Sequence, residues 1–132
     1  MTRQIISTPR APSPKAPISQ AVRSGNLLFV SGITPFTLDL QLAKGDFEAQ
    51  MRQALENVRA ILEAGGSSLR NVIKCTVILA KREDWPAMNA IYQSYWPDRD
   101  YPARTAFEAP LPHPDFLVEV ECVAECNDGE NE

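Results

Sequence analysis

One arginine near the C-terminal end of the chain stands in a segment that otherwise favours burial. The segment "PARTAFEA", residues 102–109, is a short and mostly apolar predicted strand with Arg104 inside it. A buried guanidinium is costly unless an anion meets it, and its planar fork binds a carboxylate through two hydrogen bonds. The anion that meets Arg104 is therefore an acidic side chain of the same chain, a group on another subunit, or an acidic substrate.

The next predicted strand supplies acidic candidates for this role. If the last two strands form a hairpin around "PLPH" (110–113), Arg104 lies opposite Glu119. Alternation of side chains then gives one apolar core face and one mixed face, which holds Arg104, Glu119, Leu117 and Val123. This mixed face is either covered by another subunit or exposed, with an Arg–Glu pair worth about 0–1 kcal/mol. The residues alone leave both interpretations open.

The elements that must position Arg104 follow from hydrophobic spacing and from turn residues. Apolar residues recur at helical spacing from Asp46 to Ala64, with Asp46 as the N-cap and Gly65-Gly66 as the stop. Strands flank a Ser24-Gly25 turn. The remaining elements are a helix at about 84–95 and strands at 72–80, 103–109 and 116–124. This order predicts an α/β (α+β) domain with both helices on one face of a mixed sheet.

Composition bounds the number of domains and the class of partner. The 132 residues, of which 44% are hydrophobic and 23% charged, fit a single domain over 1–132. Proline spacing predicts an extended arm at about 1–15, and a polar tail at about 126–132 is expected to fray. The net charge of −4 without a basic block disfavours nucleic acid, and no apolar run is long enough to span a membrane. We therefore expect a cytoplasmic protein.

Cysteine and histidine usage argues against metal and disulfide chemistry. The three cysteines, Cys75, Cys122 and Cys126, form no CxxC pair, and their odd number disfavours a disulfide framework. Cys75 and Cys122 lie in predicted strands and are expected to be buried thiols in a reducing cytosol. The single histidine, His113, lies between two prolines and is expected to be a turn residue with an exposed ring. No metal site is predicted.

Several segments taken together resemble the RidA (YjgF) family. They are "APISQAVRSGNLLFVSGITP", "QALENVRAILEAGGSSLRNVIKCTVIL", "MNAIYQSYW", "PARTAF" and "LPHPDFLVEVECVA", in the family's order from about Ala16 to Ala124. The resemblance implies a chorismate-mutase-like fold assembled as a homotrimer, with the sheets forming a central barrel and clefts between subunits. It also implies hydrolysis of small enamines and imines, such as 2-aminoacrylate, to 2-oxo acids and ammonia without a cofactor.

The same resemblance implies roles for individual residues. "PART" matches the family's carboxylate-binding motif, so Arg104 would bind the substrate carboxylate. Glu119 in "VEVE" matches the family glutamate that positions and deprotonates the attacking water. Backbone N–H groups near Ser31-Gly32 and Thr105-Ala106 would orient the ligand, and a neighbouring subunit would supply Asn89. The substrate-binding residues implied in this way are Ser31, Gly32, Ile18, Asn89, Thr105 and Ala106.

Three positions depart from the family pattern and bear on the substrate. Ile18 stands where many members have tyrosine, Ile33 where many have glutamine, and Ala106 where several have cysteine. A more apolar cleft favours larger or more hydrophobic imines. Two alternatives stay open: a non-catalytic trimer that binds 2-oxo acids, and a hydrolase like the 2-aminomuconate deaminases, which share the "LPHP" stretch with His113. The ribonuclease label carried by some family members finds no support in this acidic chain, which lacks a basic and aromatic groove.

Overall fold

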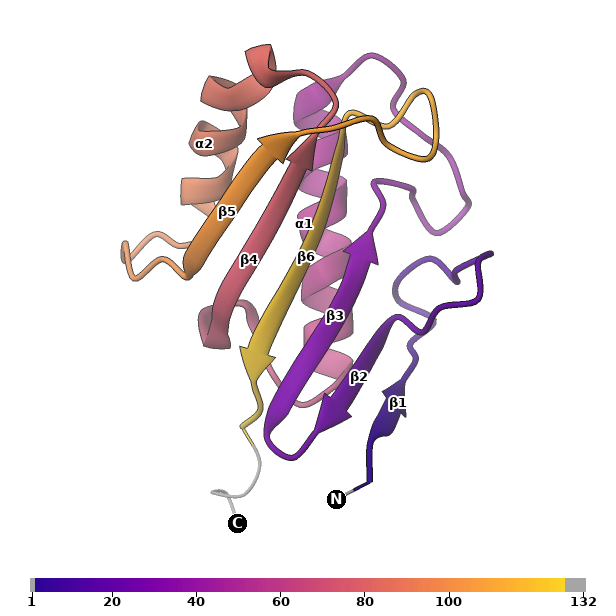
Figure 1. Ribbon diagram of the computed structural model, residues 1–132, viewed down its shortest axis with the longest axis vertical. Coiled ribbons are helices and arrows are strands. Elements are labelled where there is room, and N and C mark those ends of the chain that lie inside the picture. Colours follow the sequence, from indigo (N-terminus) through magenta and orange to yellow (C-terminus); the bar gives the residue numbers. More distant parts are fainter. Residues whose placement is uncertain (1, 128–132) are drawn as a thin grey trace.

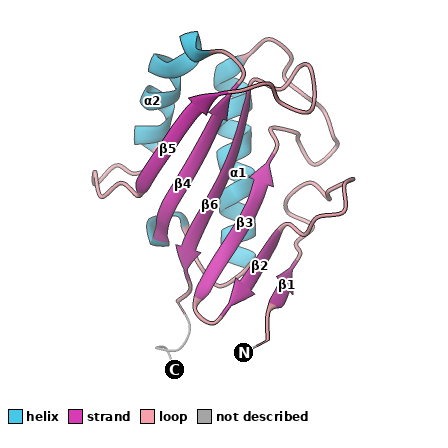
Figure 2. Cartoon of the chain, viewed as in Figure 1, coloured by secondary structure: helices cyan, strands magenta, loops and turns pink. Residues whose placement is uncertain are grey.

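The protein folds as one sheet with both helices lying across the same face (Figures 1 and 2), in a computed structural model that describes residues 2–127. The strands are ordered β1-β2-β3-β6-β4-β5 across the sheet. The mixed sheet with helices on one face confirms the fold class predicted from the sequence. The elements are β1 (Gln4–Ile6), β2 (Ala21–Ser24), β3 (Leu27–Ile33), α1 (Phe47–Ala64), β4 (Val72–Leu79), α2 (Trp85–Ser94), β5 (Ala103–Glu108) and β6 (Val118–Glu125), with short 3-10 turns at Leu69–Asn71 and Arg82–Asp84.

Helix α1 begins and ends at the residues that the sequence indicates. The Asp46 carboxylate accepts a hydrogen bond from the Ala49 N–H at 3.0 Å, which caps the first turn. At the other end Gly65 packs so closely on Leu28 of β3 that an added Cβ would lie 2.6 Å from a Leu28 methyl. Gly66 then takes a left-handed φ of 86°. The buried apolar face of α1 covers the sheet with Phe47, Met51, Ala54, Leu55, Val58, Ala60, Ile61 and Leu62.

Three buried amide side chains hold the connections around this core. Gln50 and Asn57, seven residues apart on α1, interrupt its apolar face. Gln50 donates to the carbonyls of Ala43 and Asp115 and accepts from the Leu117 N–H. The third amide, Gln20, and the contacts of Asn57 belong to the walls of a pocket described below. These amides anchor loops that have no strand partner of their own.

The predicted hairpin between the first two long strands is confirmed. Ala21 pairs with Val30 and Ser24 with Leu27, and Gly25 in the turn has a φ of 62°. The predicted N-terminal arm contains the short edge strand β1, which pairs with β2. Of the predicted tail, residues 128–132 lie outside the described residues, whereas the N–H groups of Cys126 and Asn127 donate to the carbonyls of Asn26 and Gly66.

The predicted hairpin between the last two strands is wrong. Strand β4 lies between β5 and β6, parallel to β5 and antiparallel to β6. Strand, helix and strand over residues 72–108 form a βαβ unit, whose strands pair in parallel, so the other edge of β4 is left for β6. Cys75 is therefore the partner of Arg104, and Ile78 is the partner of Glu119. Arg104 and Glu119 are not opposite each other.

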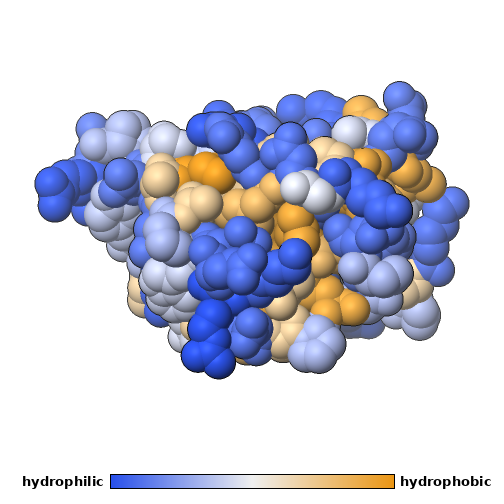
Figure 3. Space-filling view, turned by 90° about the horizontal axis from the view of Figure 1, so that it is seen from above, coloured by the Kyte–Doolittle hydropathy of each residue, from blue (hydrophilic) through white to orange (hydrophobic). Residues whose placement is uncertain are grey.

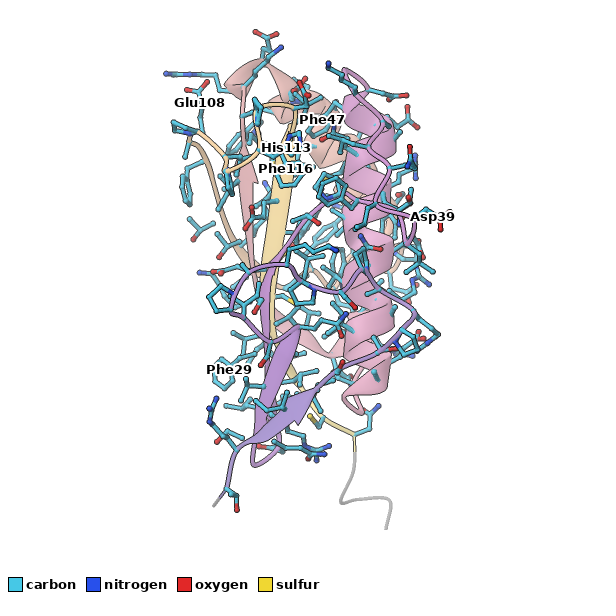
Figure 4. All side chains as sticks on the ribbon, turned by 90° about the vertical axis from the view of Figure 1, so that its right-hand side faces the viewer. Phe29, Asp39, Phe47, Glu108, His113 and Phe116 are labelled. Carbon is cyan, nitrogen blue, oxygen red and sulfur yellow. The ribbon has the colours of Figure 1, made fainter. Side chains whose placement is uncertain are left out.

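The face of the sheet away from the helices carries exposed apolar side chains. Phe29 on β3 and Phe107 on β5 are 46% and 45% exposed, and Phe29 points away from α1 (Figure 4). Phe29 pairs with Val123 on β6, and Phe107 pairs with Ile78 on β4. No helix within residues 2–127 is long and apolar enough to cross a membrane. An uncovered apolar sheet face of this kind is typical of an interface.

Candidate active site

Arg104 lies on the edge strand β5, on the side of the sheet that faces α2. Its Cζ lies 4.8 Å from the centroid of the Tyr92 ring and 5.8 Å from that of the Trp85 ring. Trp85 and Tyr92 are seven residues apart on α2 and so share one face of the helix. These rings hold the guanidinium through cation–π contacts. Arg104 has no acidic or hydrogen-bonding partner among residues 2–127, which leaves its N–H groups available for an anion.

A pocket of about 460 Å³ lies beside Arg104 and α2. Asn89, which the sequence singled out, lines this pocket together with Arg104. Two guanidinium groups, Arg99 and Arg104, and two side-chain amides make the pocket suited to an anionic ligand. Gln93, Arg99 and Tyr101, which the sequence analysis did not single out, also line the pocket, as does Tyr92.

Glu119 lies on β6, on the face of the sheet that the helices leave open. Its carboxylate contacts Gly32 of β3, because a Cβ added to Gly32 would lie 2.2 Å from Glu119 Oε2. The other oxygen, Oε1, is buried and accepts no hydrogen bond from any described residue. Burial and the neighbouring charge of Glu121 raise the pKa of Glu119. A carboxylate with a raised pKa and an unused acceptor atom is suited to take a proton from water.

Three of the predicted substrate-binding residues lie on the Glu119 side of the molecule. Ile18 and Gly32 line a second pocket, of about 340 Å³. Ser31 precedes Gly32, but both of its donors are used within the chain: its Oγ donates to the Ser19 carbonyl at 2.6 Å and its N–H to the Gln20 carbonyl at 3.0 Å. Of the backbone N–H groups expected near Ser31-Gly32 to orient a ligand, that of Ser31 is thus already used, and a role for that of Gly32 stays a prediction; the Ser31 hydroxyl is not a free nucleophile.

Thr105 and Ala106 follow Arg104 on the edge strand and lie on opposite faces of the sheet. The Thr105 hydroxyl accepts a hydrogen bond from Lys74 Nζ at 3.2 Å. Ala106 pairs with Val77 and packs against the core. Since β5 is the last strand of the sheet, only one of its edges is paired in the described part of the chain.

The two groups of predicted site residues stay apart within one chain. Arg104 and Glu119 lie on strands that β4 separates, so these strands are about 10 Å apart, at two inter-strand spacings, and the partners of the two residues are also three positions apart along β4. Their side chains also point to opposite faces, because the partner of Arg104 is the buried Cys75 and that of Glu119 is Ile78. In a 2-imino acid the carboxylate is bonded directly to the imine carbon. One chain by itself therefore cannot present both side chains to one such molecule.

His113 differs from its predicted environment. It lies in the connection between β5 and β6, as expected of a turn residue, but its ring is half-buried rather than exposed. The ring lies beside Phe116 (Figure 4) and stacks on it with centroids 4.8 Å apart. It also meets the Phe36 ring edge-on, with centroids 5.9 Å apart. Its Nδ1 accepts a hydrogen bond from the Asp115 N–H at 3.0 Å. These contacts anchor the connection.

The thiols of Cys75 and Cys122 are buried, as the sequence predicted. Burial raises the pKa of Cys75 to about 11 and raises that of Cys122 further above its ordinary value. Both thiols stay protonated at neutral pH and are poor nucleophiles. No cluster of three or more histidine, cysteine or acidic residues suited to a metal ion occurs within the described part of the chain.

Comparisons with known proteins cover nearly the whole chain. The family model described as endoribonuclease L-PSP matches residues 8–126. A RutC family protein of Pyrococcus horikoshii is 43% identical over 123 residues, which cover 92% of this chain and 97% of that protein. The 3-aminoacrylate deaminase RutC of Acinetobacter baylyi is 36% identical over 94% of this chain and 98% of its own length. A crystal structure of RidA from an Antarctic Psychrobacter species has a TM-score of 0.87 at 35% identity and covers 92% of this chain and 98% of that one.

Proposed function

Because the chain belongs to the RidA family, we propose that it is an enamine/imine deaminase that converts 2-imino acids to 2-oxo acids and ammonia. The observation that carries the proposal is the guanidinium of Arg104, which faces a pocket without an acidic partner among the described residues. The name of the Acinetobacter relative, a 3-aminoacrylate deaminase, supports the same class of reaction.

In the proposed reaction Arg104 binds the substrate carboxylate and Glu119 activates water. The Glu119 carboxylate takes one proton from water while the water oxygen forms a bond to the carbon of the protonated imine, C=NH2+, which gives a neutral carbinolamine, C(OH)NH2. Return of that proton to the nitrogen makes it an ammonia leaving group. The C–N bond then breaks and the C=O bond of the 2-oxo acid forms as the Glu119 carboxylate takes the hydroxyl proton, with no change of oxidation state and no co-reactant other than water.

The site that we propose lies between two copies of the chain. The Arg104 pocket with Asn89 comes from one copy, and Gly32, Ile18 and Glu119 come from its neighbour. The exposed apolar residues on the open face of the sheet, among them Phe29 and Phe107, support burial of that face in an assembly. A homotrimer with three such sites agrees with the arrangement expected from the sequence. The unpaired acceptor Oε1 of Glu119 would then face the substrate and its water.

The first test follows imine loss directly in wild type and in Arg104→Ala. An amino-acid oxidase generates the 2-imino acid, and semicarbazide traps what survives. We expect wild type to suppress trapping and Arg104→Ala to lose roughly a hundredfold in kcat/KM, because a bidentate charged contact is worth about 3 kcal/mol. Arg70→Ala, at an exposed arginine outside both pockets, is the matched control and should retain activity. Equal activity of Arg104→Ala and wild type would contradict the proposal.

A second candidate function is a trimer that binds 2-oxo acids without turnover. The apolar side chain of Ile18, which is 51% exposed, favours this candidate, because it offers no polar group for water activation. Thermal stabilisation of wild type by 2-oxobutanoate, together with no effect on semicarbazide trapping, would identify the binder. Suppressed trapping identifies the deaminase.

A further inference from the structure

An apolar pocket of about 340 Å³ lies between the N-terminal arm, the end of β3 and α1. Its lining includes Ala16, Ile18, Ile33, Phe36, Leu40 and Phe116. The volume falls at the lower end of the range for sites that bind small molecules, which starts at about 300 Å³. Figure 3 views the molecule from one end and shows apolar surface lying between hydrophilic margins.

One wall of the pocket is the arm between β1 and β2, which Gln20 holds in place. The Gln20 amide is buried and makes four hydrogen bonds to the arm. It accepts from the Thr8 N–H at 2.7 Å and donates to the carbonyls of Thr8, Ala11 and Pro12. A wall fixed in this way keeps its shape without a ligand, so a ligand need not order the arm when it binds.

The opposite wall is the loop after β3, and it is fixed as well. Asn57 of α1 donates to the Thr34 carbonyl at 3.0 Å and to the Phe36 carbonyl at 2.8 Å. Further along, Leu40 has a left-handed φ of 60°, and its N–H donates to the Thr37 carbonyl at 2.9 Å. A bulky residue in this conformation is costly and persists where its surroundings require it. In this conformation the apolar side chain of Leu40 lines the pocket.

The pocket and the proposed catalytic carboxylate meet at one residue. Gly32 lines the pocket, and the Glu119 carboxylate contacts the same glycine. A substrate whose imine carbon lies at Glu119 would therefore lie beside a residue that also lines the pocket. Ile18 and Ile33 both line the pocket and offer only hydrocarbon to a substituent there, with Ile33 pointing to the helix side of the sheet like its partner Val120.

We infer that this pocket receives the side chain of the substrate, so that the preferred substrates are 2-imino acids with bulky apolar side chains, such as those formed from leucine, methionine or phenylalanine. This inference rests on the proposed function. Burial of each additional methylene in an apolar pocket improves kcat/KM by about tenfold or more. The leucine-derived imine should therefore exceed the 2-aminobutyrate-derived imine by at least about tenfold in kcat/KM.

The test narrows the pocket with Ala16→Phe and compares two imines in the trapping assay. The ratio of kcat/KM for the leucine-derived imine to that for the 2-aminobutyrate-derived imine should fall by about tenfold or more in Ala16→Phe. The matched control is Ala64→Phe, the same substitution at an exposed alanine outside both pockets, which should keep the wild-type ratio. A wild-type ratio near one, or an unchanged ratio in Ala16→Phe, would overturn the inference about the pocket. Turnover of either imine would still support the deaminase proposal.

Binding without turnover gives an independent readout. Wild type should gain more thermal stability from 4-methyl-2-oxopentanoate than from pyruvate at equal concentration, and Ala16→Phe should lose that difference. If no imine is hydrolysed but this difference is present, the deaminase proposal fails and the side-chain pocket stands. Equal stabilisation by both 2-oxo acids would overturn the pocket.

Discussion

Glu119 combines two properties that a structural carboxylate seldom has. Its Oε1 is buried without a hydrogen-bond partner among the described residues, and its Oε2 is in contact with the Gly32 backbone. Both burial and the charge of Glu121 disfavour the ionised form. Natural proteins rarely keep such a group without a use for it. A general base is the role that suits it, because a higher pKa strengthens its affinity for the proton of water.

The raised pKa of Glu119 leads to an expected pH profile. A base must be ionised to act, so kcat/KM should fall as the pH is lowered through a pKa above the usual carboxyl value. Glu121→Gln removes the like charge, so ionisation becomes easier and the acid limb should move to lower pH. Burial of Glu119 remains in this variant, so the pKa that governs the fall of kcat/KM at low pH should stay above that of a free glutamate. The pH dependence of kcat/KM with an imine of fixed supply measures this shift.

The control for this profile is Glu125→Gln, which removes an exposed carboxylate from the same strand. It should leave the acid limb in place. An acid limb that moves equally in both variants would reflect net charge alone, and a limb that moves in neither would exclude Glu119 as the titrating base.

At the scale of elements, the end of β3 sets the position of Glu119. The ladder between β3 and β6 has an irregularity between Val30 and Ile33, so Gly32 lies where regular pairing is interrupted. The Glu119 carboxylate occupies the space that a side chain at position 32 would fill. Only glycine permits this close approach of backbone and carboxylate.

Gly32→Ala should therefore reduce activity far more than stability. The new methyl group would meet the far end of a flexible side chain, which can rotate away, so the free energy of unfolding should change by less than about 1 kcal/mol. The displaced carboxylate should lower kcat/KM by about a hundredfold, since misplacement by about 1 Å costs that much. Denaturant unfolding and the trapping assay measure the two quantities.

A double variant checks the cause of that loss. If Gly32→Ala acts through the carboxylate, adding it to Glu119→Gln should produce little further loss of activity. Additive losses would mean that Gly32 acts through another group, and full activity of Gly32→Ala would show that the carboxylate position is unimportant.

Local elements were predictable from the sequence, whereas strand order was not. Helix α1 has a cap, a periodic apolar face and a glycine stop within its own residues, and the β2–β3 hairpin has its turn at Gly25. The order of β5, β4 and β6 depends on a nonlocal choice. The βαβ unit over 72–108 was legible in the same sequence and would have placed β5 beside β4. The sequence therefore singled out Arg104 and Glu119 as candidates, but it placed them wrongly relative to each other.

At the scale of the whole molecule, the proposed site is divided between two faces of one sheet. Tyr92 and Trp85 hold Arg104 on the α2 side, while Glu119 lies on the open side with Gly32. Within a single chain Arg104 and Glu119 cannot be brought together, and no local sequence pattern indicates how copies of the chain associate. A second copy is the simplest means of bringing a guanidinium to this carboxylate.

This division predicts complementation between two inactive variants. Arg104→Ala and Glu119→Gln, each nearly inactive alone, should regain activity when co-expressed, because some interfaces then join an intact Arg104 to an intact Glu119. Activity should be measured on mixed assemblies that are separated by a tag on one variant, with each variant co-expressed with itself as the control. No recovery in assemblies that contain both variants would place both residues of the site on one copy.

Size-exclusion chromatography with light scattering should find three copies per assembly.

The three buried amides form most of their hydrogen bonds with main-chain groups, besides one that Asn57 accepts from the Gln53 side chain. Gln20 holds the backbone of residues 8–12, Asn57 the carbonyls of Thr34 and Phe36, and Gln50 the backbone at residues 43, 115 and 117. Side chains on these segments can thus be exchanged during evolution while the loops keep their course. Because the amides hold the backbone of these loops, single substitutions in the pocket lining can change which ligands the pocket binds while the fold stays the same.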